Sequence, residues 1–164
     1  MSKKKQTDKP QRIDYWDDPA APKPTSRKSS ASAVITDDTG RILLLHRPDN
    51  GLWTIPTGGV KKNETVAEAA IRETHEETGL EIEIAGLVGI FSDPRHLIEY
   101  ADGEVRQPIN ICFRGTPTGG HLTTTDEASE VLWVSPSDIA DFEIHPAIML
   151  RIHHALATDE PHLG

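Results

Sequence analysis

The chain has 164 residues, of which 36% are hydrophobic and 5% aromatic, and its formal net charge at pH 7 is −9. This length amounts to one domain that is long enough to bury a substantial core. No apolar run approaches the roughly 20 residues that a membrane-spanning helix needs, and the basic N-terminus does not lead into the apolar core of a signal peptide. We therefore expect a cytoplasmic protein without a membrane partner.

The charge is divided unevenly along the chain. Residues 1–30 carry eight Lys or Arg and four Asp, whereas residues 31–164 carry nine Lys or Arg and 22 Asp or Glu. An acidic body disfavours nucleic acid as a partner, because phosphate recognition by counterion release requires a basic surface. The balance suits a protein that contacts phosphate groups through metal ions.

Residues 1–30 are predicted to form a flexible N-terminal arm. They include three consecutive lysines and four prolines, a composition that cannot build its own core. Tyr15 and Trp16 are the exception, since two adjacent aromatic side chains could hold the arm against the domain or against a partner chain, as in a homodimer. Both alternatives remain open, and the composition favours disorder.

Strands are predicted to begin after this arm. Two short apolar runs, 33–35 and 42–45, flank the turn sequence D-D-T-G at 37–40, which predicts a β-hairpin. Further along, Gly58 and Gly59 precede a helix, and adjacent glycines allow the main chain to approach a ligand closely.

The start and the end of that helix are both marked in the sequence. Thr65 and Glu68 have the T-x-x-E spacing of a capping box, so a helix should begin after Thr65. Gly79 stands where a left-handed C-terminal cap is needed. The residues between them are mostly good helix formers and include no Gly or Pro.

Three acidic residues of this helix, Glu73, Glu76 and Glu77, stand at i, i+3 and i+4, so their carboxylates converge. Such like charges repel each other, and an oxygen-ligated cation such as Mg²⁺ or Mn²⁺ would neutralise them. Arg72 lies four residues before Glu76 and is placed to hold the carboxylates by charged hydrogen bonds. The alternative is a solvated acidic face, which would be the better explanation of an isolated E-x-x-E-E sequence.

A longer pattern favours the metal site. Gly58 is followed after five residues by Glu64, and after seven more by R-E-T-H-E-E-T-G-L at residues 72–80. This stretch resembles the Nudix box, G-x5-E-x7-R-E-U-x-E-E-x-G-U, in which U is a bulky aliphatic residue. Thr74 occupies one aliphatic position, where its methyl group can still pack in the apolar stripe of the helix.

The remaining elements are predicted from apolar runs and turn signals. They are a strand at 81–91 interrupted by Gly86 and Gly89, a loop at 92–108 with its tip at Asp102 and Gly103, strands at 109–114 and 130–134, a short helix after Ser135 and a last helix from Pro146. Cys112 is the one cysteine, so no intrachain disulfide can form, and its apolar surroundings predict burial. We expect a Nudix hydrolase domain at 31–158 and a C-terminal tail at 159–164.

The resemblance to Nudix hydrolases implies an α/β fold, namely an α/β/α sandwich with a mixed β-sheet. It also implies hydrolysis of the pyrophosphate bond in a nucleoside diphosphate linked to another moiety, with Mg²⁺ or Mn²⁺ as cofactor. Carried over by position, Glu73, Glu76 and Glu77 become metal ligands and catalytic residues, and Arg72 becomes the catalytic residue that orients them.

Residues before the box are similar to the Arg, the Trp and the Pro-Gly-Gly that commonly precede it in the family. On this resemblance we expect four substrate-binding residues, Arg47, Trp53, Gly58 and Gly59, with Thr57 inserted after the proline. For Trp53, core packing is an equal alternative, and for Arg47 the alternative is a surface ion pair.

The family often adds a metal-binding carboxylate from a later loop. Glu127 resembles that residue by its position before the strand at 130–134, and Glu99 and Glu104 are its rivals. Solvated loop carboxylates are common, which is the alternative for all three.

The substrate is left open between nucleotide sugars, ADP-ribose and nucleoside triphosphates, because the box contacts only the diphosphate. Asp93 and Pro94 lie near the place of a proline in ADP-ribose-hydrolysing relatives, but out of register with it. A non-catalytic nucleotide-binding or regulatory module is the alternative function, and the complete set of box carboxylates favours the enzyme.

Overall fold

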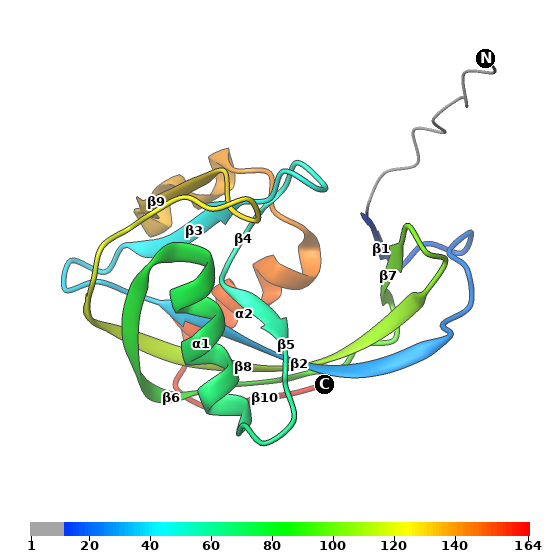
Figure 1. The fold of residues 1–164 in the computed structure, drawn as a ribbon, viewed down its shortest axis with the longest axis horizontal. Helices are drawn as coiled ribbons and strands as arrows, with labels where there is room; N and C mark the ends of the chain where they lie inside the picture. Colours follow the sequence, from blue (N-terminus) through cyan, green and yellow to red (C-terminus); the bar gives the residue numbers. More distant parts are fainter. Residues whose placement is uncertain (1–11) are drawn as a thin grey trace, which may run out of the picture.

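The protein is described by a computed structural model that covers residues 12–164 (Figure 1). Its centre is a seven-stranded sheet. The long strands β2 (Ser26–Ile35) and β8 (Val105–Gly120) pair in parallel along the whole length of β2. The sheet is mixed, because most of the other strand pairs are antiparallel.

The remaining strands extend the sheet on both sides of this pair. On one side β2 pairs with β5 (Thr57–Gly59). On the other side β8 pairs with β6 (Leu80–Phe91) and with β7 (His96–Tyr100). The outermost strands on this side are β1 (Arg12–Trp16), which pairs with β7, and β10 (His162–Leu163), which pairs with β6.

A second, three-stranded sheet has the order β4 (Trp53–Thr54), β3 (Ile42–His46) and β9 (Glu130–Val134). The predicted hairpin is therefore wrong in its pairing, because β2 and β3 lie in different sheets and share only the bridge between Thr36 and Ile42. Four successive residues of β3 are buried. β3 instead pairs along its two edges with β4 and β9, which come later in the chain.

The helices of the structure are α1 (Val66–Thr78), the short 3₁₀ helix η1 (Pro136–Asp141) and α2 (Pro146–Ala157). Alternate side chains of β2 point to opposite faces of the large sheet. Val34 packs in a cluster that contains Ile152 of α2, whereas Ile35 packs in a cluster that contains Ile71 of α1. The helices thus cover opposite faces, and the predicted α/β/α sandwich with a mixed sheet is confirmed.

Cys112 is fully buried beside Val34, as predicted. No described helix is long and apolar enough to cross a membrane.

The segment 12–30 differs from the flexible arm that its composition favoured. β1 pairs with β7 over five residues, and the Tyr15 hydroxyl donates a hydrogen bond to Glu99 at 2.7 Å. The Trp16 ring lies under the Arg95 guanidinium, 4.7 Å from ring centroid to Cζ. The composition of the segment does not indicate this ordered structure, because the residues that it contacts lie far away in the sequence. Tyr15 and Glu99, for example, are 84 positions apart. Residues 1–11, with their lysines, lie outside the described part.

Two other segments expected to be irregular contain strands. The predicted loop at 92–108 contains β7 and the start of β8, with the turn at 101–103 between them, close to the predicted tip. The C-terminal tail at 159–164 contains β10, and β2 runs without interruption through the boundary predicted at residue 30. The limits 31–158 of the domain stay a prediction.

Candidate active site

The candidate site is built on α1 and on β5, which packs against it. α1 begins at the predicted capping box, where the Glu68 backbone N–H donates to Thr65 Oγ1 at 3.1 Å and the Thr65 N–H donates to the Glu68 carboxylate at 2.7 Å. It ends at Gly79, whose φ of 78° is left-handed. Both ends agree with the sequence prediction, and they determine which side chains of α1 face β5.

Arg72 lies at the centre of the acidic residues. Its Nε and Nη2 donate to the two carboxylate oxygens of Glu64 at 3.0 and 2.7 Å, and Nη2 also donates to the Gly59 carbonyl at 3.0 Å. Its Nη1 donates to Glu73 at 2.8 Å and to Glu76 at 3.2 Å. The bond from Arg72 lowers the pKa of Glu64 to about 2, and the same bond raises the pKa of Arg72. One guanidinium therefore ties β5, the loop before α1 and two helix carboxylates together.

Gly58 of β5 lies directly against the Glu73 carboxylate. A methyl group at Gly58 would lie 2.1 Å from Glu73 Cδ and 2.2 and 2.5 Å from its two oxygens. These distances are far inside van der Waals contact, so only glycine leaves room for the carboxylate at this place. A methyl group at the neighbouring Gly59 would meet nothing within 4 Å. A methyl group at Gly58 would therefore displace the Glu73 carboxylate from its present position, whereas one at Gly59 would displace nothing.

Glu77 points from α1 into the interior, where it is 2% exposed. Its Oε1 accepts a hydrogen bond from the Thr57 backbone N–H at 3.2 Å. Burial, together with the nearby charge of Glu73, raises the pKa of Glu77 well above its usual value, and Arg47 offsets part of this increase. Thr57, which is inserted relative to the family pattern, thus supplies the main-chain group that contacts Glu77.

These residues fit a hard divalent cation. Glu73, Glu76 and Glu77 supply oxygen ligands only, which is the preference of Mg²⁺ and Mn²⁺. The mutual repulsion that raises the Glu77 pKa is what a cation between the carboxylates would relieve. The Glu73 carboxylate lies directly against Gly58 of β5 and is held by its hydrogen bond from Arg72. That each of the three is a ligand stays a prediction.

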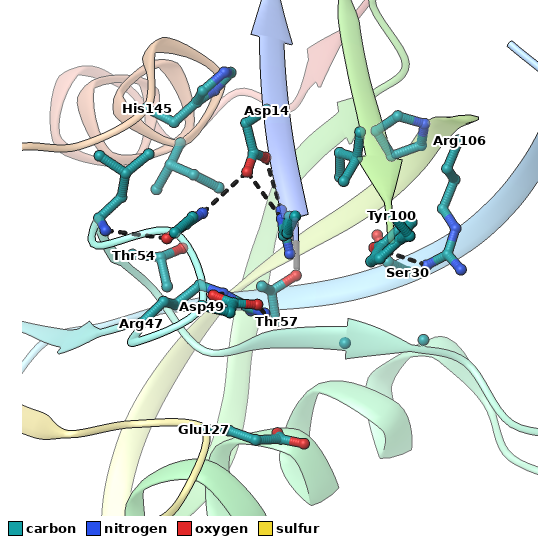
Figure 2. Close-up of a pocket in the computed structure, with 18 of the residues that line it drawn as sticks. Asp14, Ser30, Arg47, Asp49, Thr54, Thr57, Tyr100, Arg106, Glu127 and His145 are labelled. Atoms are coloured by element: carbon teal, nitrogen blue, oxygen red, sulfur yellow. Dashed lines mark hydrogen bonds and ion pairs between the residues drawn. The ribbon is translucent and has the colours of Figure 1, made fainter. Parts of the chain in front are cut away.

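A pocket of about 940 Å³ lies beside these carboxylates. Its lining includes Glu73 and all of the other residues that the sequence assigned to substrate or metal outside the helix, namely Arg47, Trp53, Gly58, Gly59 and Glu127. Figure 2 shows Glu127 extending from the loop that connects β8 to β9. Glu76 and Glu77 are outside this lining, and Arg72 connects Glu76 to it through Glu73.

Arg47 and Trp53 have the structural contacts that the sequence analysis named as alternatives, and both also line the pocket, so substrate contact by either stays a prediction. Arg47 donates to Asp49 from Nε at 2.9 Å and from Nη2 at 2.7 Å, so it makes an ion pair while it lines the pocket. The Trp53 ring packs edge-on against Phe142, with ring centroids 5.0 Å apart, and it also lines the pocket. The structural contacts of Arg47 and Trp53 are compatible with a position in the pocket wall.

The two rivals of Glu127 are occupied elsewhere. Glu99 accepts the hydrogen bond of Tyr15, and Glu104 pairs with Arg106 at 2.9 Å and with Lys28 at 3.1 Å. Neither lines the pocket, whereas Glu127 does. Glu127 therefore remains the best candidate for the additional carboxylate.

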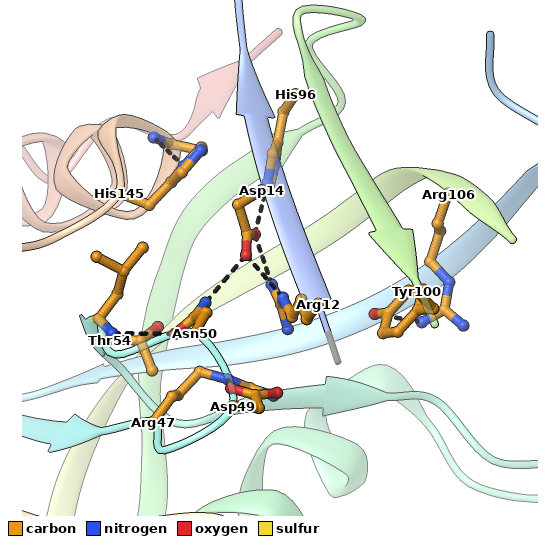
Figure 3. Close-up of polar contacts among 12 residues, drawn as sticks. Arg12, Asp14, Arg47, Asp49, Asn50, Thr54, His96, Tyr100, Arg106 and His145 are labelled. Atoms are coloured by element: carbon orange, nitrogen blue, oxygen red, sulfur yellow. Dashed lines mark hydrogen bonds and ion pairs between the residues drawn. The ribbon is translucent and has the colours of Figure 1, made fainter. Parts of the chain in front are cut away.

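The pocket continues to polar residues that the sequence analysis did not single out. They are Arg12 and Asp14 of β1, His96 of β7 and His145 at the start of α2 (Figure 3). Arg151 within α2 also lines this part of the pocket. Asp14 and His96 come together through the pairing of β1 with β7, which no local sequence signal shows. Arg151 had one signal in the sequence. Ile148, Met149, Ile152 and Leu156 repeat at helical spacing and form an apolar stripe of the last helix that predicts core, and Arg151 is a charged residue next to Ile152.

Comparisons with known proteins identify the family of the chain. The family model for the NUDIX domain matches residues 26–154. A MutT-like protein from Streptomyces ambofaciens is 29% identical over 87% of this chain and 86% of its own length. A putative 8-oxo-dGTP diphosphatase from Bacillus subtilis is 30% identical over 70% of each chain. The crystal structure of a MutT protein from Methanosarcina mazei superimposes with a TM-score of 0.63 and 26% identity, and covers 85% of this chain and all of that one. With its Arg72-centred carboxylates beside an open pocket, the chain belongs to the Nudix family of pyrophosphohydrolases.

Proposed function

We propose that the protein hydrolyses the pyrophosphate bond of a nucleoside diphosphate linked to another moiety, with Mg²⁺ or Mn²⁺ held by Glu73, Glu76, Glu77 and Glu127. The observation that supports this most directly is the position of Glu73. Its carboxylate is seated over Gly58, bonded to Arg72 at 2.8 Å, and lines the pocket. A carboxylate on a merely solvated acidic face would not need a glycine opposite it.

The residues of the chain have distinct roles in this proposal. A bound divalent cation would neutralise pyrophosphate oxygens and lower the pKa of a bound water. Arg72 fixes the direction of Glu73 and Glu76, and the Thr57 N–H fixes that of Glu77. Arg47 places a positive charge in the wall of the pocket, where it can contact a phosphate oxygen.

We propose a class of substrates, nucleoside diphosphate derivatives, and no single compound. A pocket of about 940 Å³ is the size that small-molecule sites have. The relative named as a putative 8-oxo-dGTP diphosphatase supports nucleoside triphosphates as one candidate. Nucleotide sugars and ADP-ribose carry the same diphosphate and remain candidates. The acidic body supports a small molecule over nucleic acid, and a cytoplasmic location is part of the same proposal.

The decisive experiment is a nucleotide panel tested with Mg²⁺, with Mn²⁺ and with EDTA. We expect at least one compound to release phosphate or a nucleotide, and we expect this release to require the metal ion. Glu77→Gln keeps the shape of the side chain and an acceptor for the Thr57 N–H, so it should fold, and we expect it to lose at least about 10²-fold in kcat. If wild type and Glu77→Gln are equally inactive across the panel, the enzyme proposal fails. Binding of a nucleotide without cleavage would then favour the non-catalytic module.

A further inference from the structure

The part of the pocket formed by β1, β7 and α2 contains a charged group that the carboxylates of α1 do not account for. Arg151 is 3% exposed and lines the pocket. Among the described residues it makes no hydrogen bond and no ion pair, and its Nε is buried without a partner. Its guanidinium lies over the Phe91 ring, with Cζ 5.7 Å from the ring centroid. Burial lowers the pKa of Arg151 to about 10, which still leaves the guanidinium charged at neutral pH.

Two imidazoles lie in the same part of the pocket. The rings of His96 and His145 have centroids 4.8 Å apart, and both Nε2 atoms are buried without a hydrogen-bond partner. His145 Nδ1 accepts the backbone N–H of Ala147 at 3.1 Å, as the cap of α2. A neutral imidazole that accepts at Nδ1 carries its proton on Nε2, so His145 presents an unused donor to the pocket.

The one carboxylate in this group is already neutralised. Arg12 donates to both oxygens of Asp14, at 2.8 and 2.9 Å, and Asn50 donates to Asp14 at 3.0 Å (Figure 3). His96 Nε2 lies 3.7 Å from Asp14 Oδ1, too far for a hydrogen bond. The charge of Asp14 is therefore paired with Arg12, and the charge of Arg151 is not paired at all.

A cation site is the obvious alternative, because ligand atoms of Asp14, His96 and His145 all lie within 4.8 Å of one another. The surrounding chemistry opposes it. Both oxygens of Asp14 accept from Arg12, the free lone pair of His145 is used by the helix cap, and a second guanidinium is buried beside the group. A divalent cation would have to enter a region whose net charge is already positive.

We propose that Arg151 and the Nε2 atoms of His145 and His96 form a subsite for an anionic oxygen group, a phosphate or a carboxylate. The subsite and Glu73 line one pocket, so the anionic group would belong to the substrate and would lie outside its scissile diphosphate. This assignment to the substrate rests on the proposed function. A buried, unpaired charge is strongly unfavourable for folding, and an anion at this place removes the penalty. The planar fork of Arg151 is suited to two oxygens of one group.

The first test needs no catalysis. Metal-free protein in EDTA is titrated with inorganic phosphate and with acetate, and its thermal unfolding is followed. We expect the melting temperature of the wild type to rise with one or both anions, and that of Arg151→Met to stay unchanged by them. Without anion, Arg151→Met should unfold at a higher temperature than wild type, because an unpaired buried charge has been replaced by an apolar side chain of similar length. Arg41→Met is the matched control, since Arg41 is exposed, pairs with Asp37 and lies outside the pocket.

The second test uses pairs of substrates that differ only in the additional anion. UDP-glucuronate against UDP-glucose tests a carboxylate, and NADP⁺ against NAD⁺ tests a phosphate. We expect wild type to favour one charged member by at least about tenfold in kcat/KM, mainly through KM, and Arg151→Met to lose that preference. Arg151→Lys should keep part of it, since the charge remains without the fork.

The outcomes separate this proposal from the proposed function. If no substrate is cleaved but the anions still raise the melting temperature through Arg151, the enzyme proposal fails and the anion site stands. Equal responses of wild type and Arg151→Met to the anions, or no response of the wild type, would refute the subsite. Stabilisation by Zn²⁺ alone, lost in His145→Asn, would show that the cluster is a cation site and would also refute it.

Discussion

Gly58→Ala is the substitution that tests the geometry of the acidic site most directly. The new Cβ would lie 2.1 Å from Glu73 Cδ, whereas ordinary contacts begin at 3.4 Å. The Glu73 carboxylate must therefore move by more than about 1 Å, and its 2.8 Å bond to Arg72 cannot survive unchanged. A displacement of this size in a group that positions the reaction costs about 10²-fold in rate. That factor corresponds to about 2.7 kcal/mol of activation free energy.

The protein itself should remain folded. Gly58 does not have a positive φ, so alanine is compatible with its backbone conformation. Removal of glycine restricts the unfolded chain by about 0.4–1 kcal/mol, which offsets part of the steric cost. We therefore expect a modest change in the free energy of unfolding, measured by urea denaturation, beside a large fall in kcat.

The assay is the initial rate of metal-dependent hydrolysis at saturating substrate, measured over a range of Mg²⁺ concentrations. Gly59→Ala is the matched comparison, because its Cβ would meet nothing within 4 Å. We expect Gly59→Ala to lose far less than Gly58→Ala, and Gly58→Ala also to need more Mg²⁺. If both variants lose activity equally, the cause is the flexibility of β5 and not the contact with Glu73. Wild-type kinetics for Gly58→Ala would refute the steric argument altogether.

Two further predictions concern stability. Thr65→Ala removes the capping-box oxygen of α1 and should lower the free energy of unfolding by about 1 kcal/mol, with an unchanged slope in urea; an unchanged midpoint would contradict the cap's contribution. For His145, burial first, and then the neighbouring His96, lowers the pKa to about 4, so between about pH 6.5 and 4 the unfolded chain binds a proton that the folded chain does not. Stability should fall from pH 7 to pH 5, by about 1–2 kcal/mol from this residue after solvent screening. Asparagine can still cap α2, so His145→Asn should show a shallower pH dependence than wild type. Equal slopes for the two proteins would show that His145 is not held neutral.

The helix of the site could be predicted almost completely from the sequence, because its determinants are local. Thr65 and Glu68 start α1 and Gly79 ends it, each through bonds that span four residues or fewer. The interruptions predicted at Gly86 and Gly89 appear as shifts in the register of β6 against β8.

The other part of the pocket could not be predicted because pairing over long sequence distances creates it. Asp14 and His96 meet only when β1 pairs with β7, and the composition of residues 1–30 indicates disorder instead. Arg151 is different, since a charged residue beside the apolar stripe of the last helix is visible in the sequence itself. The apolar spacing predicts core, and Arg151 is buried beside Ile148 and Ile152 while it also lines the pocket.

The two ends of this pocket have opposite charge, and that difference constrains how a polyanionic substrate can bind. Without a cation, Glu64, Glu73 and Glu76 share the guanidinium of Arg72, and Glu77 has Arg47 nearby, which is itself paired with Asp49. Carboxylates therefore outnumber guanidinium groups at the end formed by α1, so this end repels phosphate. At the Arg151 end the one carboxylate is paired with Arg12, and the buried guanidinium attracts phosphate in either condition. Metal-free protein should therefore bind an anion only at the Arg151 end, and addition of Mg²⁺ should create a second place for it. A titration with inorganic phosphate that gives the same stoichiometry with and without Mg²⁺ would contradict this division of the pocket.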